Sequence, residues 1–187
     1  MSIRLLLRSM LVAAMLSVIG FSPAASRIWK PSPEKLTSDY ASIEDQRTNG
    51  FVLIIWFVPS MLPPDSPGVQ LLTALLDKYV FIIAVHAELD KATGSMSFQD
   101  IDALQASDQM ANQLIFVPRD NLPPTSIAMV AVLENFFRQS FGQVGKGMKM
   151  FVFEAGAVNS CKKGELSVPF AGETYTWETP FPGCPEN

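Results

Sequence analysis

The chain has 187 residues, of which 48% are hydrophobic and 17% charged, and its formal net charge is −4. Its fourteen prolines indicate long ordered connections rather than disorder, because apolar runs are spread throughout the sequence. An acidic chain does not attract phosphate backbones or anionic lipid, so the charge argues against nucleic acid and anionic membranes as partners.

The N-terminus has the pattern of an export signal. Arg4 and Arg8 precede an almost wholly apolar stretch at residues 10–21, which small residues follow. This order of basic, apolar and small segments is typical of a signal peptide, and cleavage after Ala24 or after Ser26 fits equally well. The apolar stretch is about twelve residues long, whereas a membrane-spanning helix needs about twenty.

An uncleaved anchor and an ordinary core helix are the alternatives to a cleaved signal. Cleavage would remove two of the fourteen basic residues and leave twelve against eighteen acidic ones, so the mature chain would carry about −6. We expect an exported chain, periplasmic or secreted, with no stable membrane span after cleavage. Its partner would be a protein or a small ligand in the envelope or outside the cell.

We place the signal peptide at residues 1–26. The sequence after it suggests an arm and one domain. Residues 27–50 are polar and have no sustained period, so we expect an arm or linker, with a short helix possible over residues 33–47. The roughly 160 residues of the mature chain suit one domain. We therefore place a single globular domain at residues 51–187.

A strand, a helix and a second strand are expected in the first half of this domain. Residues 51–58 are continuously apolar and stop at a proline, which is typical of a strand buried on both faces. Residues 68–78 carry a helical apolar period, and residues 79–89 again favour a strand. Strand, helix and strand over about forty residues predict a parallel βαβ unit.

Shorter elements are expected in the middle of the chain. Ser97 is a plausible N-cap for a short helix over residues 98–104, and residues 114–117 suggest a short strand. Residues 148–153 alternate loosely and favour a third long strand.

The strongest helix signal begins after Pro123. Its apolar residues keep the helical rhythm, at Ile127, Val130, Leu133, Phe137 and Phe141. Met129, Val132 and Phe136 widen the apolar face well beyond one stripe. Gly142 and Gly145 are expected to end the helix.

The C-terminal segment predicts an antiparallel β-hairpin closed by a disulfide. Alternating apolar residues on both sides of a turn at residues 171–173 favour the hairpin. Cys161 and Cys184 are the only cysteines, and an even pair in an exported chain favours a disulfide. A catalytic thiol activated by His86, the only histidine, and a two-cysteine metal site are the alternatives. The fold class is thus a mixed α/β (α+β) sheet with a parallel βαβ unit, packed helices and this hairpin.

One group of polar residues could carry chemistry. His86, Glu88 and Asp90 are spaced by two at the end of an expected strand, and such side chains share one face of a strand. An imidazole with two carboxylates can hold a divalent metal or serve acid–base chemistry. The simpler alternative is a solvated strand end.

Other motifs fail on spacing or order. The segment from Asp90 to Asp102 lacks the ligand spacing of a calcium loop. The glycines at positions 142, 145 and 147 follow a helix, whereas a phosphate loop precedes one. Ser160 and Lys163 match a serine–lysine spacing that Ser32 and Lys35 match as well, so the match carries little information.

No motif specifies a chemistry, and we expect no cofactor. The first hypothesis is an exported binding or accessory domain that uses the hairpin aromatics Tyr175, Trp177 and Phe181, although these rings can equally cap the sheet. Under it, Trp177→Ala leaves folding intact and abolishes partner capture. The alternative is a small hydrolase-like or metal-binding protein centred on His86 and its neighbouring carboxylates. A purely structural accessory domain is the third possibility.

Overall fold

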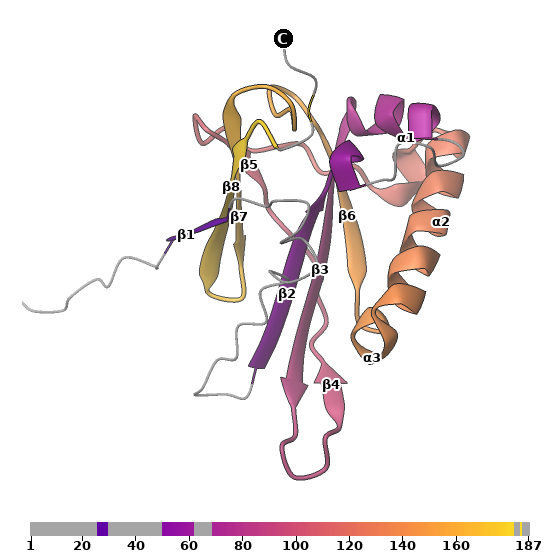
Figure 1. The fold of residues 1–187 in the computed structure, drawn as a ribbon, viewed down its shortest axis with the longest axis vertical. Helices are drawn as coiled ribbons and strands as arrows, with labels where there is room; N and C mark the ends of the chain where they lie inside the picture. The colour runs from indigo at the N-terminus through magenta and orange to yellow at the C-terminus, as the bar shows by residue number, and fades with distance from the viewer. Residues whose placement is uncertain (1–25, 30–49, 62–68, 182–183, 185–187) are drawn as a thin grey trace, which may run out of the picture.

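The structure is a computed structural model that describes residues 26–29, 50–61, 69–181 and 184. The expected signal peptide, apart from Ser26, lies outside these residues, as does most of the expected arm with its possible helix. The described elements form three layers, with a central sheet between a C-terminal sheet and a layer of helices (Figure 1).

The central sheet contains the three long strands expected from the sequence. They are β2 (Gly50–Phe57), β3 (Tyr79–Leu89) and β6 (Lys149–Glu154). β3 pairs with β2 on one side, and on the other side with β6 and then β4 (Met96–Phe98), always antiparallel. The sheet is therefore organised around β3.

Both faces of the central sheet are buried, which explains the continuous apolar runs in its strands. In β2, Ile54 and Trp56 face the C-terminal sheet, whereas Leu53, Ile55 and Phe57 face the helices. Successive side chains of a strand point to opposite faces, so a strand covered on both sides needs apolar residues at every position. The predicted two-sided burial is confirmed.

The predicted parallel βαβ unit is wrong. β2 and β3 run antiparallel, although a helix, α1 (Val69–Leu76), does lie between them in the chain. A parallel return requires the connection to run back along the whole strand. The eight residues of α1 cover about 12 Å, whereas the eight residues of β2 cover about 26 Å. α1 therefore covers less than half the length of β2, and it does not carry the chain back along that strand.

The helix layer is completed by α2 (Pro124–Ser140) and α3 (Gly142–Gly145). The expected long helix is confirmed: a proline occupies its first position, and Gly142 interrupts it with a φ of 53°. No helix in the described part of the chain is long and apolar enough to cross a membrane.

The C-terminal sheet is built on the predicted hairpin, which is confirmed as β7 (Gly164–Phe170) and β8 (Glu173–Thr179). The two turn residues, Ala171 and Gly172, have φ values of 51° and 84°, as tight hairpin turns require. β5 (Ser107–Asp108) pairs antiparallel with β7, and β1 (Ser26–Trp29) pairs parallel with β8.

The short helix expected over residues 98–104 is absent. The Gln99 N–H donates to the His86 carbonyl at 2.8 Å, which keeps this segment attached to β3. The Phe98 ring lies directly over Gly147, where an added Cβ would come within 2.0 Å of the ring. Tertiary contacts therefore override the weak local helix signal, and the segment contributes Ile101 and Leu104 to the core.

Residues 114–117 do not form the expected strand. They lie along the outer edge of β6 and contact it through a few backbone groups. Phe116 forms a single antiparallel bridge with Phe153. The Val117 N–H donates to the Val152 carbonyl at 2.8 Å, and the Glu154 N–H donates to the Ile115 carbonyl at 2.9 Å. Two further short turns, η2 (Pro59–Met61) and η3 (Arg119–Asn121), connect the elements.

Candidate functional site

The end of β3 positions His86 and Glu88 but gives them separate contacts. Both side chains belong to the face that Ile82 and Ala84 present to the C-terminal sheet, because strand residues two apart share a face. The half-buried His86 ring meets the Phe170 ring edge-on, at 6.1 Å between centroids. The exposed Glu88 carboxylate accepts a hydrogen bond from the Gln99 side-chain amide at 3.0 Å.

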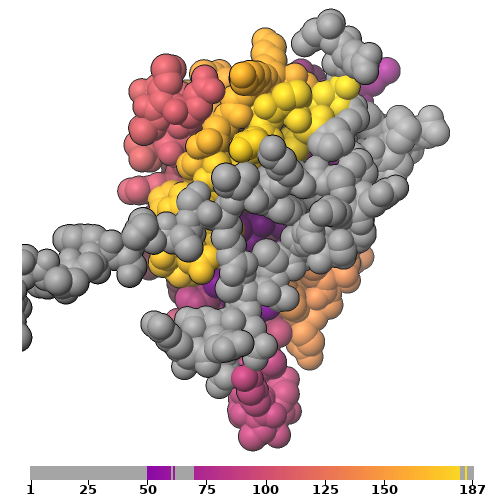
Figure 2. All heavy atoms as spheres, turned by 60° about the vertical axis from the view of Figure 1, so that its left-hand side comes forward, coloured from indigo at the N-terminus to yellow at the C-terminus, as the bar shows by residue number. Residues whose placement is uncertain are grey.

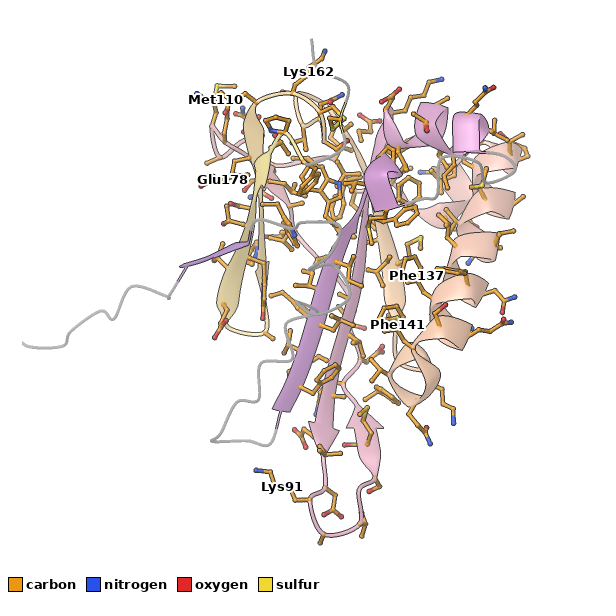
Figure 3. All side chains as sticks on the ribbon, viewed as in Figure 1. Lys91, Met110, Phe137, Phe141, Lys162 and Glu178 are labelled. Carbon is orange, nitrogen blue, oxygen red and sulfur yellow. A yellow bond between two sulfur atoms is a disulfide. The ribbon has the colours of Figure 1, made fainter. Side chains whose placement is uncertain are left out.

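Asp90 lies beyond the end of β3 and turns into its own loop. Its carboxylate accepts the Ala92 N–H at 2.8 Å and the Thr93 hydroxyl at 2.7 Å. These hydrogen bonds, the Thr93 one above all, hold the pKa of Asp90 below its ordinary value. The loop is the tip of the β3–β4 hairpin, which projects from the body of the molecule in two views (Figures 2 and 3), and Lys91 lies where this loop leaves β3 (Figure 3).

The three polar residues therefore do not converge on one point. Two share the expected face, while the third organises a turn beyond it. In residues 26–29, 50–61, 69–181 and 184, no three His, Cys, Asp or Glu side chains are grouped so that they could hold a metal ion. Their contacts match the simpler alternative of a strand end leaving the core.

The hairpin aromatics are core residues, so they pack against the sheet, which is one of the two roles that the sequence allows them. Tyr175, Trp177 and Phe181 are at most 6% exposed. Trp56 on β2 meets the Trp177 ring at 6.3 Å and the Phe181 ring at 4.9 Å, both edge-on. Alternate residues of β8 point toward the central sheet, so the aromatic positions that suggested a binding face form the inner side of a two-sheet sandwich.

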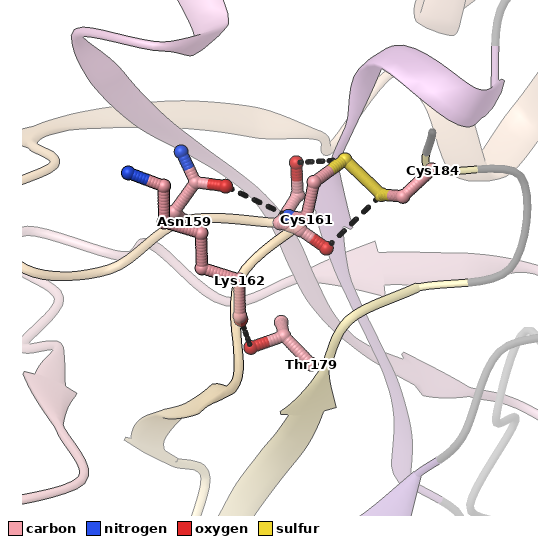
Figure 4. Close-up of a disulfide and its surroundings, with 6 residues drawn as sticks. Asn159, Cys161, Lys162, Thr179 and Cys184 are labelled. Atoms are coloured by element: carbon pink, nitrogen blue, oxygen red, sulfur yellow. Dashed lines mark hydrogen bonds between the residues drawn. A yellow bond between two sulfur atoms is a disulfide. The ribbon is translucent and has the colours of Figure 1, made fainter. Parts of the chain in front are cut away.

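The disulfide between Cys161 and Cys184 is confirmed (Figure 4). Its surroundings are ordered by short contacts: the Cys161 N–H donates to the Asn159 side chain at 2.8 Å, and the Thr179 hydroxyl donates to the Lys162 carbonyl. Both sulfur atoms are bonded to each other, so neither cysteine is a free nucleophile or metal ligand in this structure.

Among the helices that the structure describes, α2 carries the largest grouping of exposed apolar side chains. Val132 is 65% exposed and Phe136 is 58% exposed, next to half-buried Met129. Residues three and four apart are neighbours on a helix, so these three form one continuous strip, which we call the α2 flank. In the sequence, the same three residues widen the apolar face of the expected helix beyond one stripe.

Charged side chains of α2 lie away from the flank. Glu134 and Arg138 are its only charged residues, and the helical period places both roughly opposite Phe136. Glu134 pairs with Arg119 at 3.0 Å, rather than with Arg138 four residues further on. The core side of the helix is formed by Ser126, Val130, Leu133 and Phe137, and Figure 3 shows Phe137 directed toward the sheet.

A second exposed feature is the loop that follows β5. The buried Asp108 carboxylate accepts the Met110 N–H at 2.8 Å, the Asn112 N–H at 2.9 Å and the Asn112 side-chain amide at 3.0 Å. These bonds, first that of the Asn112 side chain, hold the pKa of Asp108 below its ordinary value. The loop thereby holds Met110 in an exposed position (Figure 3).

Comparison with known proteins gives no relative from which a function could be transferred. No protein-family model, no curated protein and no solved structure matches this chain. The function must therefore be argued from the surface of the molecule itself.

Proposed function

We propose that this chain is an exported domain that acts by binding another protein, and that the α2 flank is the contact surface. The observation that carries the proposal is the exposure of Val132 and Phe136 on a helix whose inner side is already fully packed. Export is supported by the N-terminal pattern and by the disulfide, which persists in oxidising compartments.

Single exposed apolar residues are ordinary on protein surfaces, but a continuous and uncharged strip is less so. Cores of protein interfaces are rich in aromatic residues and methionine and poor in charged residues. The α2 flank has this composition, with Met129, Val132 and Phe136 and no charged residue of the helix on that side. Their spacing also suits a helix that lays one apolar side into a groove of its partner. The partner is thus expected to present an apolar groove.

Site-specific photocrosslinking tests this proposal in the cells that produce the protein. A photoreactive phenylalanine analogue at position 136 should give one discrete adduct with another protein. The same analogue at Ala131, which is exposed on the other side of the helix, should not give it. Val132→Asp should abolish the adduct at position 136, because it places a charge within the apolar contact.

Circular dichroism of the purified Val132→Asp variant should match that of the unmodified chain, since Val132 is exposed. Equal adducts at positions 131 and 136, or no adduct at either, would contradict the proposal. An adduct with twice the mass of the chain would also overturn it, because the chain would then bind a second copy of itself.

A further inference from the structure

The loop after β5 presents one methionine far from the core. Met110 is 67% exposed, the highest fraction among the large hydrophobic residues that the structure describes. Figure 3 shows it at the outer margin of the molecule, beside the C-terminal sheet. The thioether of Met110 is therefore open to small reagents in the surrounding solution.

The backbone of this loop holds Met110 in its exposed position. The Ala111 N–H donates to the Asp108 carbonyl at 2.9 Å, and the Asp108 N–H donates to the Asn112 carbonyl at 3.0 Å. Ala111 has a φ of 62°, in the left-handed region, which closes the turn. Together with the hydrogen bonds to the Asp108 carboxylate, these contacts tie down the chain on both sides of Met110. The exposure of Met110 is thus a property of the folded loop.

Other side chains that react with oxidants are less accessible. Both cysteines are joined in the disulfide, so no free thiol competes for an oxidant. Trp56, Trp177 and Met148 are at most 6% exposed. The other methionines in the described ranges are half-buried, and they are Met61, Met96, Met129 and Met150. Within the part of the chain that the structure describes, Met110 is therefore the sulfur-containing side chain that a dissolved oxidant reaches most easily.

We infer that Met110 is a site of reversible oxidation, at which a peroxide transfers one oxygen atom to the thioether. A lone pair of the Met110 sulfur attacks a peroxide oxygen, so an S–O bond forms while the O–O bond breaks. The sulfur is oxidised by two electrons to the sulfoxide, and hydrogen peroxide is reduced to water. A dithiol reductant reverses the step: the sulfoxide oxygen leaves as water, and the dithiol becomes a disulfide.

The folded protein accommodates the oxidised side chain at this position. A sulfoxide is polar, so inside the core it would lose its hydration at a large cost in free energy. At Met110 the sulfoxide stays in water, and the hydrogen bonds of the loop do not involve the sulfur. Oxidation of Met110 should therefore leave the free energy of unfolding almost unchanged, so the oxidised protein stays folded until it is reduced again.

Peptide mapping of the purified protein tests this inference. During treatment with hydrogen peroxide, mass spectrometry should show the gain of one oxygen atom at Met110 several-fold faster than at half-buried Met129. Met110→Leu should remove the fast reaction and leave the slow ones unchanged. Methionine sulfoxide reductases for both sulfoxide epimers, supplied with dithiothreitol, should remove this oxygen atom from the folded, singly oxidised protein. Before that reduction, its urea midpoint should equal that of the untreated chain.

Three outcomes contradict the inference. Oxidation of Met129 as fast as that of Met110 would show that the loop gives no preferential access. A sulfoxide that the reductases remove only after unfolding in urea would show that the modification is not reversible on the folded protein. A large fall of the urea midpoint after single oxidation would show that Met110 is packed rather than exposed. None of these measurements involves a partner, so this inference and the proposed function fail separately.

Discussion

The two faces of the central sheet are covered in different ways. On one face, the C-terminal hairpin buries its aromatic residues against β2 and is tied down by a disulfide. On the other face, α2 packs through a narrow inner side and leaves Val132 and Phe136 outside. The difference shows that aromatic content alone does not locate a binding surface, since the hairpin buries Tyr175 and Trp177, whereas the helix exposes Phe136.

The largest expected effect is on the hairpin side. Trp177 is 1% exposed and contacts Trp56, so Trp177→Ala should lower the free energy of unfolding by about 3 to 5 kcal/mol. Urea denaturation followed by circular dichroism measures this loss. The sequence-based hypothesis expected folding to survive this change, and a variant of unaltered stability would show that the hairpin does not pack as described.

A smaller effect is expected at the edge of the same sheet, and it should depend on pH. The folded-state pKa of Asp108 is lowered by its hydrogen bonds with Asn112 and Met110. Its contribution to stability is therefore fully present above the ordinary aspartate pKa of 3.8 and is lost as the pH falls through the lower folded value. Asp108→Asn should destabilise the protein at neutral pH and match the unmodified chain in acid.

The urea midpoints of the variant and the unmodified chain, measured at neutral pH and in acid, test this expectation. Asp120→Asn serves as the control, because that residue is exposed and its carboxylate accepts no hydrogen bond within the part of the chain that the structure describes. A destabilisation by Asp108→Asn that stays constant down to acid pH would argue against an ionised Asp108 as the organiser of the loop.

The smallest stability effect is expected on the α2 flank. Phe136 and Phe137 are adjacent in sequence but are 58% and 3% exposed. Phe136→Ala should change the free energy of unfolding by no more than about 0.5 kcal/mol, whereas Phe137→Ala should cost about 3 to 5 kcal/mol. Thermal or urea denaturation of the pair measures the contrast. Equal losses for both would show that the flank is part of the core.

Much of the fold was predictable because the strands and the long helix carry strong local signals. The bounds of β3 match the expected range, and the hairpin turn lies where its residues placed it. Strand direction was not predictable from apolar runs, because an antiparallel sheet covered on both faces shows the same continuous run as a parallel one. The segment at residues 98–104 follows distant contacts with Gly147 and β3, which leave no local signal.

The candidate surfaces were harder to predict. The spacing of His86 and Glu88 correctly placed them on one face, but it carried no information on the bonds that direct Asp90 into its loop. Trp177 is buried because the central sheet packs against the hairpin. The alternation of apolar residues along one strand does not show that a second sheet covers it. The extra width of the apolar face on α2 was visible in the sequence, although its exposure was not.

The residues that run along β6 bear on pairing of this strand with another molecule. β6 contains the segment Met150-Phe151-Val152-Phe153, which combines strong strand propensity with few charges. An open edge on such a strand is a template for pairing with another molecule. Ile115 and Val117 occupy backbone hydrogen-bonding groups at this edge. This short stretch of irregular chain therefore occupies part of the edge at which a strand of another molecule could pair.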